Sequence, residues 1–141
     1  MTKLITPQYT ACFRQWKAEG THCRYTHAYK VWFEIEFNKS YFALKQTHPE
    51  IMAVVWNMLS SLDFKTFVAT DDPYLDKFME LHRLKVISLM LLPQVGCERF
   101  SEFILNKVNT ILSEFSTDIK CLSVETFEHN KNSGIAYLPI K

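Results

Sequence analysis

The chain has 141 residues, of which 48% are hydrophobic, and it carries a formal net charge of +1. This length and apolar content suffice for one compact domain with a hydrophobic core, so we expect a single domain over residues 1–141. The balanced charge and the absence of a Lys/Arg run disfavour a nucleic-acid binder, whose affinity comes largely from basic patches. No apolar run reaches the roughly 18 residues of a membrane span, and the N-terminus is unlike a signal peptide, so we expect a cytoplasmic protein with no membrane partner.

Two strands are predicted at the start of the chain. Residues 3–13 predict the first, and Pro7 places it at a sheet edge, because proline cannot donate a ladder hydrogen bond. A turn at Glu19 and Gly20 leads into a second, long strand, whose apolar face holds every second residue: Tyr25, His27, Tyr29, Val31, Phe33, Ile35 and Phe37. Such alternation is typical of a half-buried strand, and the pair predicts an opening hairpin.

Helices and a short strand are predicted in the middle of the chain. A helix begins near Pro49, a favourable first-turn residue, and apolar residues follow at spacings of three and four: Ile51, Val54, Val55, Met58, Leu59 and Leu62. Asp71, Asp72 and Pro73 mark a break before a short helix over residues 74–81. The run KVISLMLLP, residues 85–93, has the length and the terminating proline of a strand.

The C-terminal third predicts a second long helix, residues 97–115, and then a hairpin around the loop HNKNSG. The complete order favours an α+β fold in which two long helices cover one face of a four-stranded antiparallel sheet. The exposed edges of such a small sheet favour self-assembly.

Four strings in this order resemble the 6-pyruvoyltetrahydropterin synthase and 6-carboxytetrahydropterin synthase family, which has the tunnelling fold. The strings are Cys-x-x-x-His at residues 23–27, LDFKTFVATDDPYL, LLPQVGCERF and VETFEHNKNSGIAY. The resemblance spans nearly the whole chain and implies a β-barrel homo-oligomer, either trimer-based or hexameric. It also implies a lyase that acts on 7,8-dihydroneopterin triphosphate in a pterin or queuosine-type pathway, with zinc held by three histidines.

The departures from the family pattern fall on the metal site. Phe13 and Tyr29 stand where two of the three zinc histidines are expected, and His27 is the single ligand position that survives. Of an Asp-His pair that moves protons, Asp63 remains and Phe64 replaces the histidine. We therefore expect no stoichiometric zinc, because catalytic zinc needs about three protein ligands.

The remaining family positions are kept. Cys23 matches the catalytic cysteine, so the resemblance makes Cys23 and Asp63 the candidate catalytic residues. Glu125, Thr126 and Glu98 are the candidate ligand-binding residues, with Glu125 pairing with a pterin ring. Simpler roles remain open: a hydrogen-bonded core histidine for His27, a buried thiol for Cys23, a capping or turn residue for Asp63, and an exposed strand position for Glu125.

Three functions remain open at this point. The first is a divergent family member that keeps a pterin- or guanine-like ring pocket without zinc-dependent catalysis. The second is an active carbon-oxygen lyase with Cys23 as the base, in which His22, Cys23 and His27 are one arrangement that could hold a metal. The third is a structural or interaction protein without a ligand. Fold alone does not choose between them.

Overall fold

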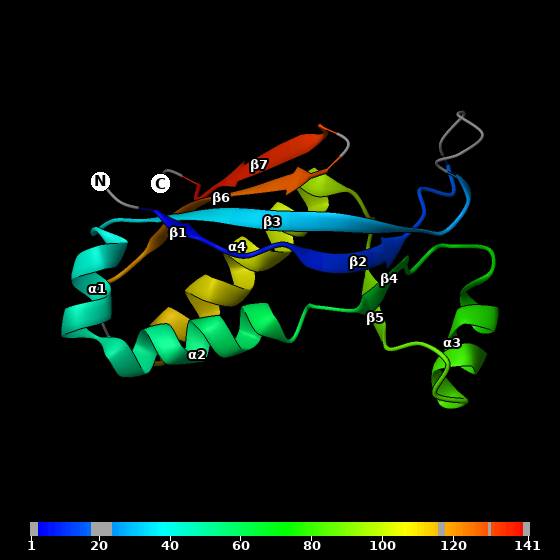
Figure 1. Ribbon diagram of the computed structural model, residues 1–141, viewed down its shortest axis with the longest axis horizontal. Helices are drawn as coiled ribbons and strands as arrows, with labels where there is room; N and C mark the ends of the chain where they lie inside the picture. The colour runs from blue at the N-terminus through cyan, green and yellow to red at the C-terminus, as the bar shows by residue number, and fades with distance from the viewer. Residues whose placement is uncertain (1–2, 18–23, 116–117, 130, 140–141) are drawn as a thin grey trace.

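A seven-stranded sheet runs through the computed structural model, which describes residues 3–17, 24–115, 118–129 and 131–139 (Figure 1). The strand order is β5-β4-β2-β3-β6-β7, and β1 also pairs with β3. The strands are β1 Leu4–Ile5, β2 Tyr9–Phe13, β3 His27–Phe37, β4 Lys65–Ala69, β5 Leu89–Leu92, β6 Cys121–Glu128 and β7 Ser133–Tyr137. The helices are α1 Tyr41–Thr47, α2 Pro49–Ser60, α3 Leu75–Arg83 and α4 Cys97–Glu114.

Strand β3 is the long strand that the alternating pattern predicts, and it lies in the middle of the sheet. From its centre onward one face is buried, with Val31, Phe33, Ile35 and Phe37 each at most 3% exposed. Its N-terminal half leaves this core, because His27 is exposed and Tyr29 only half-buried. The antiparallel pairings of β3 with β1 and β2 confirm the opening hairpin.

The predicted place of the first strand at a sheet edge is wrong. Strand β2 lies inside the sheet, between β3 and β4. Pro7 lies in the gap between β1 and β2, where a residue without an N–H donor removes no ladder hydrogen bond. Pro7 therefore correctly indicated a position without a ladder hydrogen bond, but this position is an interruption between two short strands and not a sheet edge.

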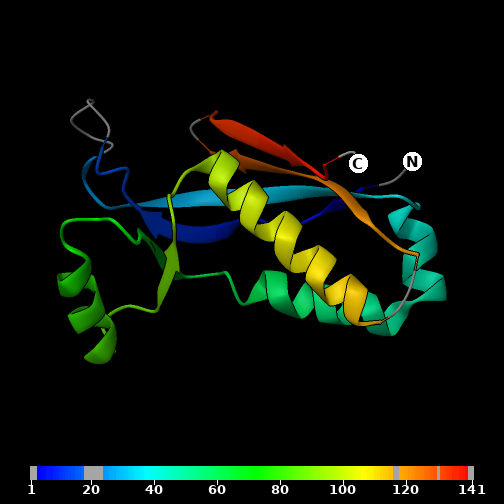
Figure 2. The same cartoon turned by 180° about the vertical axis from the view of Figure 1, so that it is seen from behind.

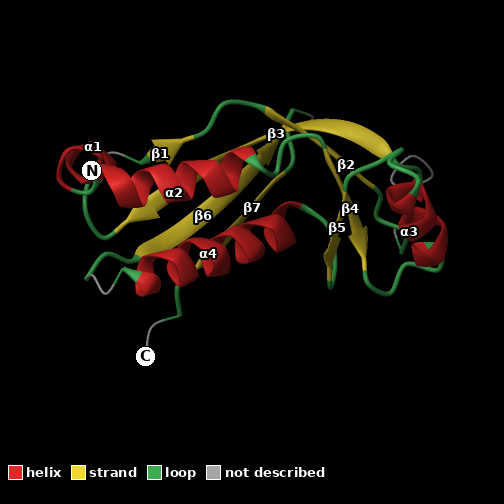
Figure 3. Cartoon of the chain, turned by 90° about the horizontal axis from the view of Figure 1, so that it is seen from below, coloured by secondary structure: helices red, strands yellow, loops and turns green. Residues whose placement is uncertain are grey.

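The two long helices, α2 and α4, cover the same face of the sheet, as Figures 2 and 3 show from two directions. Their buried side chains follow the predicted spacing in part, because Val54 of the predicted α2 face is 39% exposed and Met52 is buried in its place. Those of α2 are Ile51, Met52, Val55 and Leu59, and those of α4 are Phe100, Ser101, Ile104, Leu105, Val108 and Leu112. The resulting core lies between these helices and the inward residues of β2, β3 and β6.

The prediction of a four-stranded antiparallel sheet needs correction. The sheet has seven strands and is mixed, because β4 runs parallel to both β2 and β5. Strand β4 and helix α1 were not predicted. Lys65–Ala69 has no alternation, since Thr66, Phe67, Val68 and Ala69 are all buried, which is typical of a parallel strand covered on both faces.

Helix α3 connects the parallel strands β4 and β5 at the end of the molecule that lies far from α1 (Figure 1). It has no buried residues. No helix in the described part of the chain is long and apolar enough to cross a bilayer.

Candidate functional site

Aromatic rings occupy the place where the resemblance puts the zinc site. Phe13 on β2 pairs across the sheet with His27 on β3. Its ring stacks on Tyr29, with centroids 4.4 Å apart, and meets the ring of Phe100 edge-on at 5.0 Å. The His27 ring lies 6.0 Å from that of Tyr29.

This donor set does not fit zinc. Of the three side chains only His27 has an imidazole nitrogen, and a phenyl ring offers no lone pair. Among the residues that the structure describes, no group of three His, Cys, Asp or Glu side chains could hold a metal ion. Cys23, one of the two candidate catalytic residues, lies outside the described residues, as do His22 and the predicted turn at Glu19 and Gly20.

Asp63 lies in the turn between α2 and β4. Its Oδ1 atom accepts a hydrogen bond of 2.8 Å from the backbone N–H of Thr10 on β2. The next residue, Phe64, has a positive φ of 61° and a side chain that is 72% exposed. This geometry gives Asp63 a structural role in fixing the turn, and its role in proton transfer stays a prediction.

The three predicted ligand-binding residues lie in different places. Glu125 on β6 pairs with Glu34 on β3, and both are half-buried on the sheet face that α2 and α4 leave open. Thr126 points to the opposite face, where its hydroxyl shares a 2.7 Å hydrogen bond with Ser101 of α4. Glu98 is exposed in the first turn of α4. The structure therefore does not bring Glu125 together with Glu98 and Thr126.

A cavity of about 410 Å³ lies beside the first turn of α4, and it contains a carboxylate that sequence reasoning missed. The cavity is lined by Gln15, Gln94, Val95, Gly96, Cys97, Glu98, Arg99, Glu128, Asn132 and Ser133. Glu128, the last residue of β6, is only 5% exposed. The Cys97 thiol donates to its Oε2 atom at 3.6 Å.

The electrostatics of the Glu128–Cys97 pair follow from burial. Loss of water raises the pKa of Glu128, in spite of hydrogen bonds from Cys97 and Asn132 that lower it. Burial, followed by the charge of Glu128, raises the pKa of the Cys97 thiol to about 12. Cys97 therefore stays protonated and is a hydrogen-bond donor, not a nucleophile.

The end of the β6–β7 hairpin places Glu128 in the cavity. Side chains on a strand alternate, so Glu128 points to the same side as the buried residues Val124 and Thr126, toward α4. Gly134 on β7 allows α4 to approach, because a Cβ atom at this position would lie 2.4 Å from the backbone nitrogen of Glu98. The alternation of side chains along β6 was the signal in the sequence that could have identified Glu128. Because Glu128 is three residues from Glu125, the two side chains point to opposite faces of the sheet.

A second cavity, of about 300 Å³, shares Gln15, Gln94 and Val95 with the first. Its other lining residues are Trp16, Lys17, Ala69 and Asp71. The Trp16 indole N–H donates to Asp71 at 3.2 Å, and Lys17 forms an ion pair with the other oxygen of Asp71 at 2.8 Å. These bonds lower the pKa of Asp71, that from Lys17 most.

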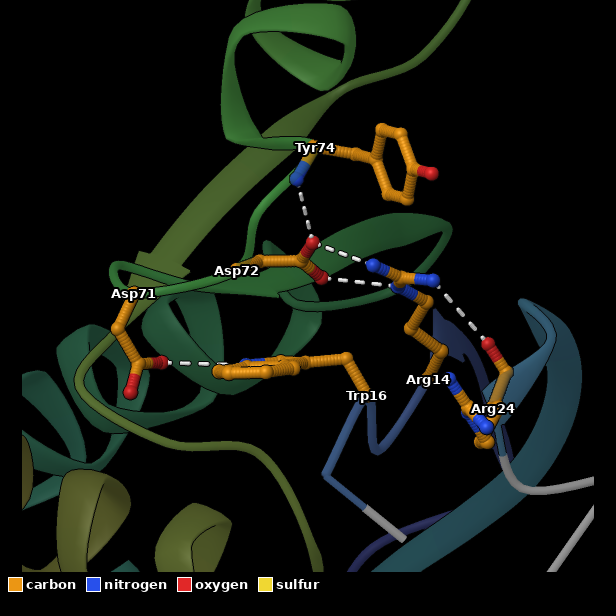
Figure 4. A network of polar contacts seen from close by, with 6 residues as sticks. All are labelled: Arg14, Trp16, Arg24, Asp71, Asp72 and Tyr74. Carbon is orange, nitrogen blue, oxygen red and sulfur yellow. Dashed lines mark hydrogen bonds and ion pairs between the residues drawn. The ribbon is translucent and has the colours of Figure 1, made fainter.

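An ion pair between Arg14 and Asp72 fixes this region of the chain (Figure 4). The guanidinium donates to both carboxylate oxygens, through Nε at 2.9 Å and through one terminal nitrogen. Asp72 also accepts from the backbone N–H of Tyr74, and Arg14 donates to the carbonyl of Arg24. Burial would raise the pKa of Asp72, but these hydrogen bonds and the cationic partner bring it below its ordinary value.

The comparisons with known proteins support the architecture. No protein-family model and no curated protein matches the chain. Among solved structures, an uncharacterised protein of Wolinella succinogenes is similar, with a TM-score of 0.68 and 14% identity over 97% of this chain and 98% of that one.

Two synthases from malaria parasites are also similar to this chain. The 6-pyruvoyltetrahydropterin synthase of Plasmodium vivax has a TM-score of 0.57 and 12% identity over 99% of this chain and 98% of its own. The 6-pyruvoyltetrahydropterin synthase of Plasmodium falciparum has a TM-score of 0.57 and 13% identity over 99% of this chain and 97% of its own. At these identities the likeness concerns the fold alone. This chain therefore has the fold of the 6-pyruvoyltetrahydropterin synthases.

Proposed function

We propose that the protein binds a pterin- or guanine-like heterocycle in the cavity beside α4, without the zinc-dependent chemistry of the synthases that it resembles in fold. The observation that carries this proposal is Glu128, a buried carboxylate that faces a cavity large enough for a bicyclic ring. The hydrogen bonds from Cys97 and Asn132 do not offset the burial of Glu128, whose pKa stays raised, so further donors from a ligand in the cavity would stabilise its charged form.

The chemistry of Glu128 suits one edge of such rings. Guanine and pterin present a ring N–H beside an exocyclic amino group, and a carboxylate accepts two parallel hydrogen bonds from this pair. The raised pKa of Glu128 follows from burial, and two donors from a ligand would oppose it by favouring the charged form. The polar groups of Asn132 and Ser133 line the same cavity and can bond other ring atoms.

Phe13, Tyr29 and Phe64 argue against the lyase reaction, because they remove two metal ligands and the histidine of the proton-transfer pair. The proposed function is therefore ligand binding without catalysis, and Cys23 takes no part in recognising the ring. The pterin synthases of Plasmodium are named for a reaction that this proposal does not transfer to the present chain.

Calorimetry with guanine, pterin and a 7-deazaguanine tests the proposal, and two matched variants separate the candidate anchors. Hydrogen bonds to charged groups contribute about 1.5 to 3 kcal/mol, so Glu128→Gln should weaken binding by roughly ten- to a hundred-fold. Glu125→Gln, the same change on the open face of the sheet, should leave affinity unchanged. If Glu125→Gln weakens binding and Glu128→Gln does not, Glu125 is the anchor, as the resemblance implies. If the wild type binds none of these rings, the proposed function is overturned.

A further inference from the structure

The ring cavity and its neighbour lie side by side, since Gln15, Gln94 and Val95 line both, and the two together are called the groove below. We propose that the second cavity receives a neutral, hydroxylated substituent of the bound ring, such as a sugar or a polyol, and rejects a polyphosphate. This inference rests on the proposed function, because it concerns the group attached to the ring that Glu128 holds. It assigns the ligand class as a nucleoside-like molecule.

The charged side chains along the groove disfavour a polyanion. The cations that line it are Lys17 and Arg99, and both already have carboxylate partners. Lys17 pairs with Asp71 at 2.8 Å, and Arg99 pairs with Glu102 at 3.1 Å. Because Glu98 and Glu128 add negative charge, a triphosphate would enter a groove with no unpaired lysine or arginine among its described lining residues.

The uncharged groups of the groove suit hydroxyl groups. The carboxamides of Gln15 and Gln94 each offer donors and an acceptor, as a sugar or polyol requires. The indole N–H of Trp16 is bound to Asp71, so the ring of Trp16 contributes apolar surface to the cavity. A sugar or polyol, with hydroxyls and C–H faces, matches this combination of carboxamides and an aromatic ring.

The groove is also fixed in position before a ligand enters. Gln15 lies between Arg14 and Trp16, and both neighbours are bound to the turn at Asp71 and Asp72 (Figure 4). The Asp72 side chain is 2% exposed and accepts from Arg14 and from the backbone of Tyr74. These contacts hold the backbone at Gln15 beside both cavities, so this part of the chain loses little conformational entropy when a ligand binds.

Calorimetry on two ligand series tests the inference: guanine, guanosine and guanosine triphosphate, and pterin, neopterin and neopterin triphosphate. In the series whose bare ring binds, the hydroxylated ligand should bind roughly ten-fold tighter than the ring, as two added neutral hydrogen bonds predict. The triphosphate should bind more weakly than the hydroxylated ligand. A triphosphate that binds tightest, or a hydroxylated ligand that binds no better than the ring, would overturn the inference and leave the proposed function standing.

Two variants sharpen this test through ratios of affinity. Asp71→Asn leaves Lys17 without its carboxylate partner, so the affinity for the triphosphate should rise relative to that for the hydroxylated ligand, and added salt should reduce this gain. Gln94→Ala should lower the affinity for the hydroxylated ligand more than that for the bare ring. Unchanged ratios in both variants would contradict the second cavity as the subsite. If neither bare ring binds, the proposed function is overturned, and the inference with it.

Discussion

Glu128 is held in a place that disfavours its charge, and this has a consequence for stability. Its pKa lies above the ordinary value of 4.5, mainly because burial removes water from the carboxylate. An acid with a raised native pKa binds its proton more tightly in the folded chain than in the unfolded chain. Its contribution to the free energy of unfolding is therefore complete below the unfolded pKa and declines as the pH rises through the native pKa.

We predict that Glu128→Gln removes this decline. The variant should gain stability relative to the wild type as the pH rises above about 4.5, while it loses affinity for the ring. Urea denaturation from about pH 4 to about pH 8 measures the difference. Glu98→Gln, at an exposed position beside the same cavity, is the matched control and should keep the wild-type profile. Parallel profiles for Glu128→Gln and the wild type would contradict the prediction.

The aromatic residues at the position where the resemblance implies zinc give a second prediction at the scale of residues. The purified protein should hold far less than one zinc per chain after chelator treatment and dialysis against zinc, because Phe13 and Tyr29 supply no imidazole. Elemental analysis measures the content. The double variant Phe13→His with Tyr29→His places imidazoles at all three positions and should gain zinc. One zinc per chain in the wild type would show that other residues bind the metal.

At the scale of elements, the α4 N-terminus and the β6–β7 hairpin shape the cavity together. Gly134 is the point of contact, since its missing side chain leaves room for the backbone of Cys97 and Glu98. Ser101 strengthens this contact by donating a hydrogen bond of 2.8 Å to the carbonyl of Gly134. The position of Glu128 relative to α4 therefore depends on how closely the helix and the hairpin approach.

We predict that Gly134→Ala separates the two elements. Its Cβ atom would lie 2.4 Å from the backbone nitrogen of Glu98, and overpacking of this kind costs about 1 to 3 kcal/mol. Urea denaturation should show this loss, and calorimetry should show weaker ring binding. Ser133→Ala, at the exposed neighbouring position, should change stability by less than about 0.5 kcal/mol. A Gly134→Ala protein as stable as the Ser133→Ala protein would rule out the close approach.

The elements also show where sequence reasoning succeeded and where it failed. Local periodicity predicted β3, α2 and α4, because each is long enough for its pattern to repeat. It missed β4, whose five residues are buried on both faces, and α1, which has seven residues. The parallel pairing of β2 with β4 joins segments about fifty residues apart, and no local pattern encodes such a contact.

The candidate site depended on the register of a hairpin. The string VETFEHNKNSGIAY contains both Glu125 and Glu128, and the resemblance selected Glu125 within it. Glu128 becomes a candidate through two features that are visible only in the structure: its burial and its contact with Cys97 on α4. Residues thirty-one positions apart meet there, so the sequence predicted the right hairpin without the position of its carboxylates relative to the helix.

At the scale of the whole molecule, the sheet ends in two strands that could pair further. Within the described residues, β5 pairs only with β4, and β7 pairs only with β6. Apolar side chains at these edges are exposed, with Leu91 on β5 at 41% and Tyr137 on β7 at 67%. Unpaired edges with apolar side chains favour association, and a second copy of the chain brings the complementary edge.

We therefore predict a closed homo-oligomer, trimer-based or hexameric as the resemblance implies, which light scattering at micromolar concentration would detect. Leu91→Lys and Tyr137→Lys place charge on the two edges, and each should shift the mass toward that of a monomer, because lysine at an edge strand opposes pairing. Val54→Lys, a matched change at a 39% exposed apolar residue of α2, should leave the assembly intact. A monomeric wild type would exclude the assembly, and oligomers that persist in both edge variants would mean that other surfaces of the molecule hold it together.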